Sequence, residues 1–210
     1  MMTHDTSHRM GLIFILLGAA ALTAAALLAG RNLLVERRAE QNASQLLARV
    51  EQWSAQPEQV IDQAVLAEAP EDSPTIWDSY DVDGVLSIPS LGLKLPVLSQ
   101  YTEDLLKVSP CIYQGLGGSQ PQRLVIAGHN YRSHFGSLNQ LAPGDEITYR
   151  SLDKTETFFR VTQLVEIGAE DAALLEEGQW DLTLLTCNLD MSRRLLVRCG
   201  MIVPDSHNAG

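Results

Sequence analysis

An uninterrupted apolar segment near the N-terminus constrains the fold of this chain most. Residues 11–30 read GLIFILLGAAALTAAALLAG and contain no charged side chain. As an α-helix, this segment would rise about 30 Å, which matches the hydrocarbon core of a bilayer. A cleaved signal peptide is the alternative, because Arg9 precedes the apolar run and residues 24–26 resemble a cleavage site. We favour a retained membrane anchor, since the apolar stretch continues past that site.

The charges that flank the segment bear on its orientation. Arg9 precedes it, whereas Arg31, Arg37 and Arg38 follow it, and the positive-inside rule would then place the long C-terminal part in the cytoplasm. The N-terminal ten residues, however, are too short to be exported easily, and the chemistry found further along belongs outside a cell. We therefore expect a single-pass protein of the cell membrane with its C-terminal domain extracellular.

Two different segments follow the anchor. Over residues 31–55 apolar side chains recur at three- and four-residue spacing, which predicts an amphipathic helical stalk, either solvated or dimerising. Residues 54–75 mix prolines with acidic residues and alanines, as linkers or loosely docked arms do. The predicted organisation is a cytoplasmic N-terminus at 1–10, an anchor at 11–30, a stalk and linker at 31–75 and a folded domain at 76–210.

Charge and cysteine content exclude two classes of protein. The 210 residues hold 15 Lys and Arg against 26 Asp and Glu, a formal charge of -11, which repels phosphate backbones and argues against nucleic acid as a partner. Cys111, Cys187 and Cys199 are too few and odd in number for a disulfide scaffold, and none belongs to a CxxC pair. The question is therefore which thiol is reactive.

The folded domain contains many short strand candidates. From residue 81 onward, runs of branched and aliphatic residues alternate with turn signals. This pattern predicts a mostly β domain, a closed or nearly closed barrel of seven to eight strands with a few short helices. The expected strands are 85–89, 93–98, 123–128, 146–149, 157–167, 181–187 and 194–203, and the helical candidates are 103–108, 133–141 and 172–177.

Three chemically competent residues lie at the ends of predicted strands. Cys187 ends the run DLTLLTC, His129 closes LVIAGHN, and Arg194 opens the strand after the cysteine. A cysteine nucleophile needs a basic or cationic neighbour, and an arginine can hold a developing oxyanion. Taken alone, Cys187 is equally compatible with a buried apolar residue, and we expect Cys111 and Cys199 to be buried in that way.

The motifs that contain these residues resemble the sortase family. Sortases carry a T-L-x-T-C strand end, an earlier strand that ends in histidine and a following strand that begins with arginine. TLLTC at 183–187, AGHN at 127–130 and RLLVR at 194–198 occur here in that order. The resemblance covers roughly residues 81–203 and implies a closed sortase-type β-barrel.

The resemblance also implies a role for each site residue. Cys187 would be the nucleophile, His129 the acid or base and Arg194 the stabiliser of the transition state. Thr186 would line the site, and we expect it to bind substrate together with Asn130 and Asn188.

Three other residues compete for two of these roles. Strand alternation places Arg194 and Arg198 on one face and Arg193 on the other, and position relative to the LLV run favours Arg194. His134 competes with His129 as the base, but it lies in a predicted helix start, where we expect a surface role.

The implied activity is that of a cysteine transpeptidase. It would cleave a sorting signal of secreted surface proteins at a Thr-Gly-like bond through a thioester on Cys187. The acyl group would then pass to an amine of peptidoglycan or a pilin in a Gram-positive cell wall. The resemblance requires no cofactor. Calcium is a candidate through Glu170, Asp171, Glu176 and Glu177, but their spacing is not a recognisable ligand set and a solvated acidic helix is favoured.

The subclass and two rival functions stay open in the sequence. The GHN motif and the N-terminal anchor resemble class B sortases, yet the connection before the cysteine strand is short, so we expect a class B-like or class D-like enzyme. The rivals are another exported cysteine peptidase or L,D-transpeptidase, and a membrane-tethered β-barrel that binds a partner without catalysis.

Overall fold

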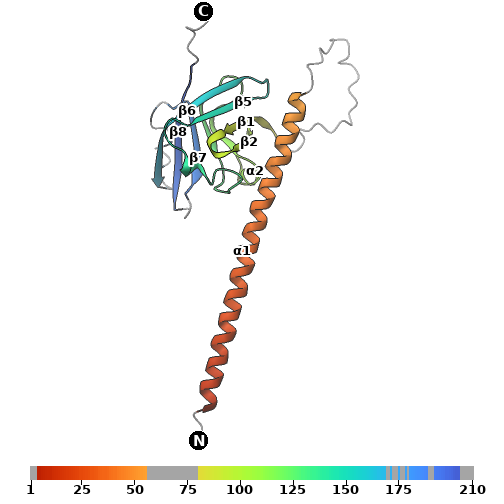
Figure 1. The fold of residues 1–210 in the computed structure, drawn as a ribbon, viewed down its shortest axis with the longest axis vertical. Helices are drawn as coiled ribbons and strands as arrows, with labels where there is room; N and C mark the ends of the chain where they lie inside the picture. The colour runs from red at the N-terminus through yellow and green to blue at the C-terminus, as the bar shows by residue number, and fades with distance from the viewer. Residues whose placement is uncertain are drawn as a thin grey trace, which may run out of the picture. The chain divides into compact units, whose positions relative to one another are not determined.

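The computed structural model contains two compact units, Met1–Arg38 and Ala39–Gly210. Helix α1 (His4–Ala55) begins in the first unit and ends in the second, and a closed β-barrel forms most of the second (Figure 1). The residues that the structure describes are 4–55, 80–168, 171, 175, 178, 180–188 and 192–203.

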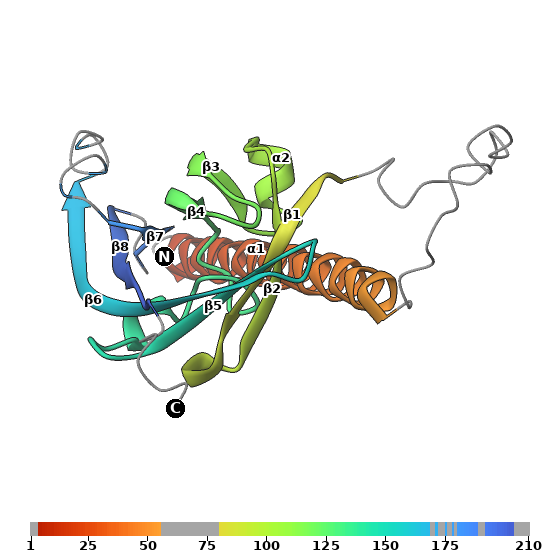
Figure 2. The ribbon, with the colours of Figure 1, turned by 90° about the horizontal axis from the view of Figure 1, so that it is seen from above.

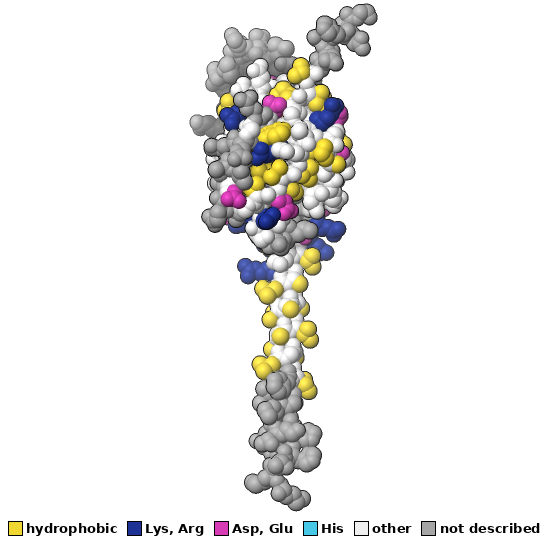
Figure 3. Space-filling view, turned by 90° about the vertical axis from the view of Figure 1, so that its left-hand side faces the viewer, with side chains coloured by type: hydrophobic (Ala, Val, Ile, Leu, Met, Phe, Trp, Pro, Cys, Tyr) yellow, Lys and Arg dark blue, Asp and Glu magenta, His cyan; other side chains and the backbone are white. Residues whose placement is uncertain are grey.

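The first unit consists of the N-terminal part of α1. In the described part of the chain, one helix is long and apolar enough to cross a membrane; it is found over Ile15–Gln52, with a mean hydropathy of 1.5 in its most apolar window, none of which is buried. Large apolar side chains such as Leu22 and Leu27 are exposed along it, and Figure 3 shows apolar side chains on the part of the helix that is coloured and visible in that view. The helix continues through residues 24–30 without a break, and its length and composition support a membrane anchor.

The second part of α1 packs against the barrel. The helical stalk predicted over 31–55 is confirmed as helix, and part of its apolar stripe is buried rather than solvated. Ala39, Ala43, Leu46 and Val50 are buried in the second unit, and Leu46 and Val50 belong to a cluster with residues of the barrel. The compact unit therefore begins at Ala39, well before the linker after which the sequence placed the folded domain.

Eight strands close the barrel, as the sequence predicted. Neighbouring strands follow the order β1-β2-β3-β4-β7-β8-β6-β5. Figure 2 shows how the long β6 bends across the barrel, where it pairs with β5 at its start and with β8 further along. The strands are β1 (Val82–Ile88), β2 (Leu93–Leu98), β3 (Cys111–Leu116), β4 (Gln122–Ala127), β5 (Glu146–Ser151), β6 (Glu156–Gly168), β7 (Leu182–Cys187) and β8 (Arg193–Met201).

The sequence missed one strand and expected one helix that does not form. Strand β3 escaped notice because most of its side chains are exposed, so no buried alternation marks it. Helix α2 (Glu103–Leu106) is where 103–108 predicted one. The helix predicted over 133–141 was wrong, because turns and the 3-10 helix η4 (Leu138–Gln140) occupy that segment. A second 3-10 helix, η3 (Pro89–Leu91), follows β1, and the candidate at 172–177 lies mostly outside the described residues.

Two strand pairings position the functional residues. Strands β4 and β7 are parallel neighbours with Ala127 opposite Leu185, so both strands end at the same mouth of the barrel. Strands β7 and β8 are antiparallel with Cys187 opposite Arg194, so β8 begins where β7 ends. The hydrophobic core beneath this mouth includes Leu184 and Leu195.

The docking of α1 predicts a measurable contribution to stability. Leu46 is 5% exposed, and Leu46→Ala should lower the free energy of unfolding of the barrel by about 2–5 kcal/mol, because the substitution leaves a cavity between helix and barrel. Urea unfolding of the full chain in detergent micelles, followed by tryptophan fluorescence, measures this. The exposed neighbour Gln45 supplies the control, since Gln45→Ala should change the unfolding free energy by less than about 0.5 kcal/mol. Equal effects of the two substitutions would contradict the docking.

Candidate active site

Cys187 occupies the last position of β7, at the mouth of the barrel. Its free thiol is partly exposed, whereas the thiols of Cys111 and Cys199 are buried. Along β7, Leu182 and Leu184 point into the core. Strand alternation therefore places Cys187 on the opposite face, at the position where the strand ends. The site is therefore one where a nucleophile can reach a substrate.

His129 is brought level with Cys187 by the parallel pairing of β4 and β7. Gly128 donates its N–H to the Leu185 carbonyl at 2.9 Å, and the Thr186 hydroxyl donates to the Gly128 carbonyl at 2.8 Å. Ala127 lies opposite Leu185, so His129 and Cys187 each lie two residues beyond this pair, at the same end of the two strands. The candidate base and the candidate nucleophile therefore belong to the same mouth of the barrel.

Close packing makes the glycine before His129 necessary. A Cβ atom on Gly128 would lie 2.5 Å from the ring of Phe135, far inside van der Waals contact. The AGHN motif therefore carries glycine because the chain turns against Phe135 immediately before the histidine.

Arg194 lies directly across from Cys187 in the β7–β8 pairing. Two hydrogen bonds join the ends of these strands: the Asn188 N–H donates to the Arg193 carbonyl at 3.0 Å, and the Arg193 N–H donates to Asn188 Oδ1 at 3.1 Å. Asn130 Nδ2 also donates to the Asn188 carbonyl at 3.3 Å. Asn130 and Asn188 therefore stabilise the backbone at the mouth of the barrel through these hydrogen bonds. Their predicted contact with a substrate stays a prediction.

The two competing arginines are engaged elsewhere. Arg193 is exposed and lies 3.8 Å from Glu166, while Arg198 is buried with its guanidinium 5.5 Å from the ring centroid of Trp180. Among the three arginines of this strand, Arg194 is the one in register with the thiol. The strand register thus supports the choice of Arg194 that its position relative to the LLV run favoured.

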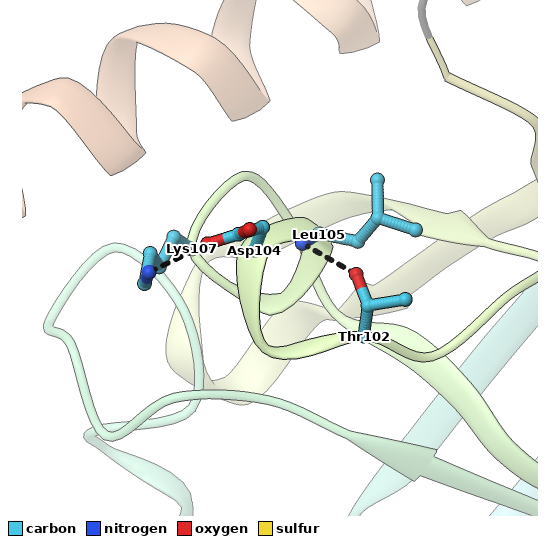
Figure 4. Close-up of polar contacts among 4 residues, drawn as sticks. All are labelled: Thr102, Asp104, Leu105 and Lys107. Carbon is cyan, nitrogen blue, oxygen red and sulfur yellow. Dashed lines mark hydrogen bonds and ion pairs between the residues drawn. The ribbon is translucent and has the colours of Figure 1, made fainter.

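A short charged helix determines part of the electrostatics around His129. Burial lowers the pKa of His129, Glu103 of α2 opposes that shift, and Lys107 adds to it. The helix is held in place by Thr102, whose hydroxyl accepts the Leu105 N–H at 3.1 Å, and Lys107 forms an ion pair with Asp104 at 2.7 Å (Figure 4). The imidazole is therefore mainly neutral near pH 7 and able to accept a proton.

A pocket of about 210 Å³ opens beside Cys187. Thr186 and Asn188, both expected at the site, line it, although the buried Thr186 hydroxyl is already engaged with Gly128. Asn139 and Glu166 also line it and were not foreseen, because only the closed barrel brings β6 and the segment after His129 next to the end of β7. The pocket offers amide and carboxylate groups within reach of the thiol.

His134 is not a surface residue, which corrects the sequence-based expectation. It has no exposed area, and burial lowers its pKa to about 4. The reason is the missing helix: the chain turns sharply after His129, with Tyr131 accepting hydrogen bonds from the N–H groups of His134 and Gly136. His134 therefore points inward.

The acidic segment proposed for calcium is largely outside the described residues, which include Asp171 but not Glu170, Glu176 or Glu177. Asp171 accepts a hydrogen bond from the Gly168 N–H at 3.1 Å. Within the described part of the chain, no three His, Cys, Asp or Glu side chains are grouped as metal ligands would be.

The burial of the three thiols predicts their relative reactivity. Burial raises the pKa of both Cys111 and Cys199 to about 12, so both stay protonated near pH 8, whereas Cys187 is accessible. A methanethiosulfonate reagent at pH 8 should therefore modify one thiol per folded chain much faster than the other two, and peptide mapping should identify Cys187. Faster labelling of Cys111 or Cys199 than of Cys187 would contradict this arrangement.

Comparison with known proteins agrees with this geometry. The family model described as the sortase domain matches residues 86–202, more than half of the chain. The chain is 32% identical to sortase A of Bacillus anthracis over 143 residues, which are 65% of this chain and 66% of that protein, just under two thirds of its length.

Solved structures of sortases share the fold. Sortase C-1 of Actinomyces oris matches with a TM-score of 0.52 and 26% identity over 60% of this chain and 76% of that one. Sortase C of Streptococcus pneumoniae matches with a TM-score of 0.50 and 26% identity over 59% of this chain and 70% of that one. Both are sortase C enzymes and the curated relative is a sortase A, so these comparisons do not confirm the class B-like or class D-like enzyme expected from the sequence. The match to the sortase domain and the arrangement of the barrel agree, and this chain belongs to the sortase family.

Proposed function

We propose that this protein is a membrane-anchored cysteine transpeptidase that cleaves a sorting signal and transfers its acyl part to an amine. The proposal is supported by strand register: the parallel pairing of β4 and β7 brings the strand ends that precede His129 and include Cys187 to one mouth of the barrel, and Arg194 pairs with the partly exposed Cys187. This arrangement supplies a nucleophile, a base and an oxyanion stabiliser.

In the first half-reaction, the sulfur of Cys187 attacks the carbonyl carbon of a threonine in the sorting signal. The thiol proton passes to neutral His129, and the carbonyl electrons move onto an oxygen that the Arg194 guanidinium stabilises. When the tetrahedral intermediate collapses, the amine of the following residue leaves with the proton from His129. A thioester between the signal and Cys187 results.

In the second half-reaction, an amine attacks the thioester carbonyl and gives a proton to His129. Collapse of this intermediate expels the sulfur of Cys187, which recovers the proton, and a new amide bond has formed. The lowered pKa of His129 favours the form that accepts a proton in both attacks.

The substrates follow from the family and its relatives. The structure report of the Streptococcus pneumoniae sortase C names pilin substrate specificity. For this chain we propose a sorting-signal peptide of a secreted surface protein as acyl donor, and an amine of peptidoglycan or of a pilin as acceptor. The apolar helix α1 supports attachment to the cell membrane, and we propose that the barrel lies outside the cell, where surface proteins are attached. The proposed chemistry needs no cofactor.

The proposal predicts a covalent adduct. Full-length protein in detergent micelles should be incubated with LPxTG-like and NPxTx-like peptides and a glycine amine, beside Cys187→Ala. Mass spectrometry should show cleavage after threonine, an acyl adduct on Cys187 and, with the amine, a transpeptidation product, all absent from the variant. A folded wild-type protein that forms no adduct with any peptide would favour a binding barrel, and cleavage retained in Cys187→Ala would favour a different enzyme.

The arginine role predicts a second, separable effect. Arg194→Lys keeps the charge but not the planar guanidinium fork, so turnover should fall about 10²-fold while the fold survives. Arg193→Lys is the matched control, because Arg193 is exposed and pairs with Glu166. Peptide cleavage kinetics measure the turnover of both variants, and circular dichroism checks that both are folded. Arg194→Lys with near wild-type kcat would remove Arg194 from the mechanism.

A further inference from the structure

His134 is the most unusual polar residue in the described barrel. Its side chain has no exposed area, and neither ring nitrogen makes a hydrogen bond of normal geometry. The mechanism above does not use it. A fully buried polar ring without normal hydrogen bonds is uncommon and needs a physical reason.

On one side, the ring of His134 contacts the ring of Tyr131, which also contacts the ring of His129. The ring centroids of His129 and Tyr131 are 4.7 Å apart with an interplanar angle of 31°, and those of Tyr131 and His134 are 5.5 Å apart with an angle of 47°. The ring of Tyr131 therefore contacts both imidazoles.

Backbone hydrogen bonds make this segment a closed turn. The Phe135 N–H donates to the His129 carbonyl at 3.0 Å, and the His134 N–H donates to the Tyr131 carbonyl at 2.9 Å. Gly136 closes the turn, since a Cβ there would lie 2.5 Å from the Asn130 carbonyl oxygen. A shift of His134 would therefore displace the backbone that carries His129.

On the other side, His134 lies against helix α1. Backbone groups of Ala39 and of Val108 are close enough to favour the charged form of the ring, although burial outweighs them. Ala39 is 1% exposed and Ala43, one turn further on, is 4% exposed. These small side chains allow the helix to approach the turn closely.

We propose that His134 is a positioning residue for His129, and that helix α1 contributes to the active site by holding His134 in place. The ring acts by its shape: it fills the space between α1 and Tyr131, and Tyr131 in turn supports the face of His129. This inference rests on the role proposed for His129.

The test replaces the ring and measures His129 directly. The chain has five histidines, so isotope-labelled histidine in the full-length protein in micelles gives resolvable NMR titrations, and His129→Gln identifies the His129 signal. In His134→Ala the turn loosens and water reaches His129, so the pKa of His129 should rise towards its ordinary value and kcat for peptide cleavage should fall about 10- to 100-fold. His134→Phe keeps the ring and should restore both properties.

Two substitutions in α1 test the contribution of the helix. Ala39→Leu puts a larger side chain against the turn and should reproduce the effects of His134→Ala, whereas Asn42→Leu, at an exposed position of the same helix, should match the wild type. Ile147→Ala, in the core of the barrel on β5, controls for lost stability and should leave the His129 titration unchanged.

Each outcome bears on the proposal. An unchanged His129 titration in both His134→Ala and Ala39→Leu would overturn it, and failure of His134→Phe to restore the titration would overturn the role of ring shape. If His134→Ala does not fold, Ala39→Leu decides. Absence of peptide cleavage by the wild type would count against the proposed function alone, because the titration requires no substrate.

Discussion

The parallel pairing of β4 and β7 is the constraint on which the rest of the site depends. A parallel pair ends at one edge, so the residues that follow Ala127 and Leu185 emerge together. The Thr186 hydroxyl and the Gly128 N–H then connect the two strand ends. Because β8 starts from the end of β7, Arg194 reaches the same place without a long connection. Backbone register thus brings the strand ends that carry the three proposed catalytic groups to one mouth of the barrel.

Differences in burial set the protonation of His129 and the accessibility of the three thiols. His129 is removed from water enough to lower its pKa, and α2 places Glu103 and Lys107, charges of opposite sign, near enough to influence it. Cys187 remains accessible, whereas Cys111 and Cys199 sit in the barrel wall with raised pKa values. The same barrel therefore keeps two thiols unreactive and leaves one available at its rim.

Helix α1 serves two environments along one continuous element. Its early part exposes an apolar surface of the kind that a bilayer covers. From Ala39 onward its apolar stripe packs on the barrel, and the ion pair between Lys94 and Glu51 joins helix and barrel at the surface. One helix thus contains both the candidate membrane span and residues that pack on the barrel, and the compact unit extends further towards the N-terminus than the folded domain that the sequence indicated.

Local patterns in the sequence were enough to predict most helices and strands of this protein and its family. The apolar run at 11–30 predicted a membrane-spanning helix, runs of branched and aliphatic residues between turn signals predicted seven of the eight strands, and the motifs that contain Cys187, His129 and Arg194 resembled the sortase family. Tertiary structure decided the burial of His134, the docking of α1, and the presence of Asn139 and Glu166 beside the thiol. Those features depend on contacts between segments far apart in the chain, which periodicity cannot reveal because it reports only which face of an element is apolar.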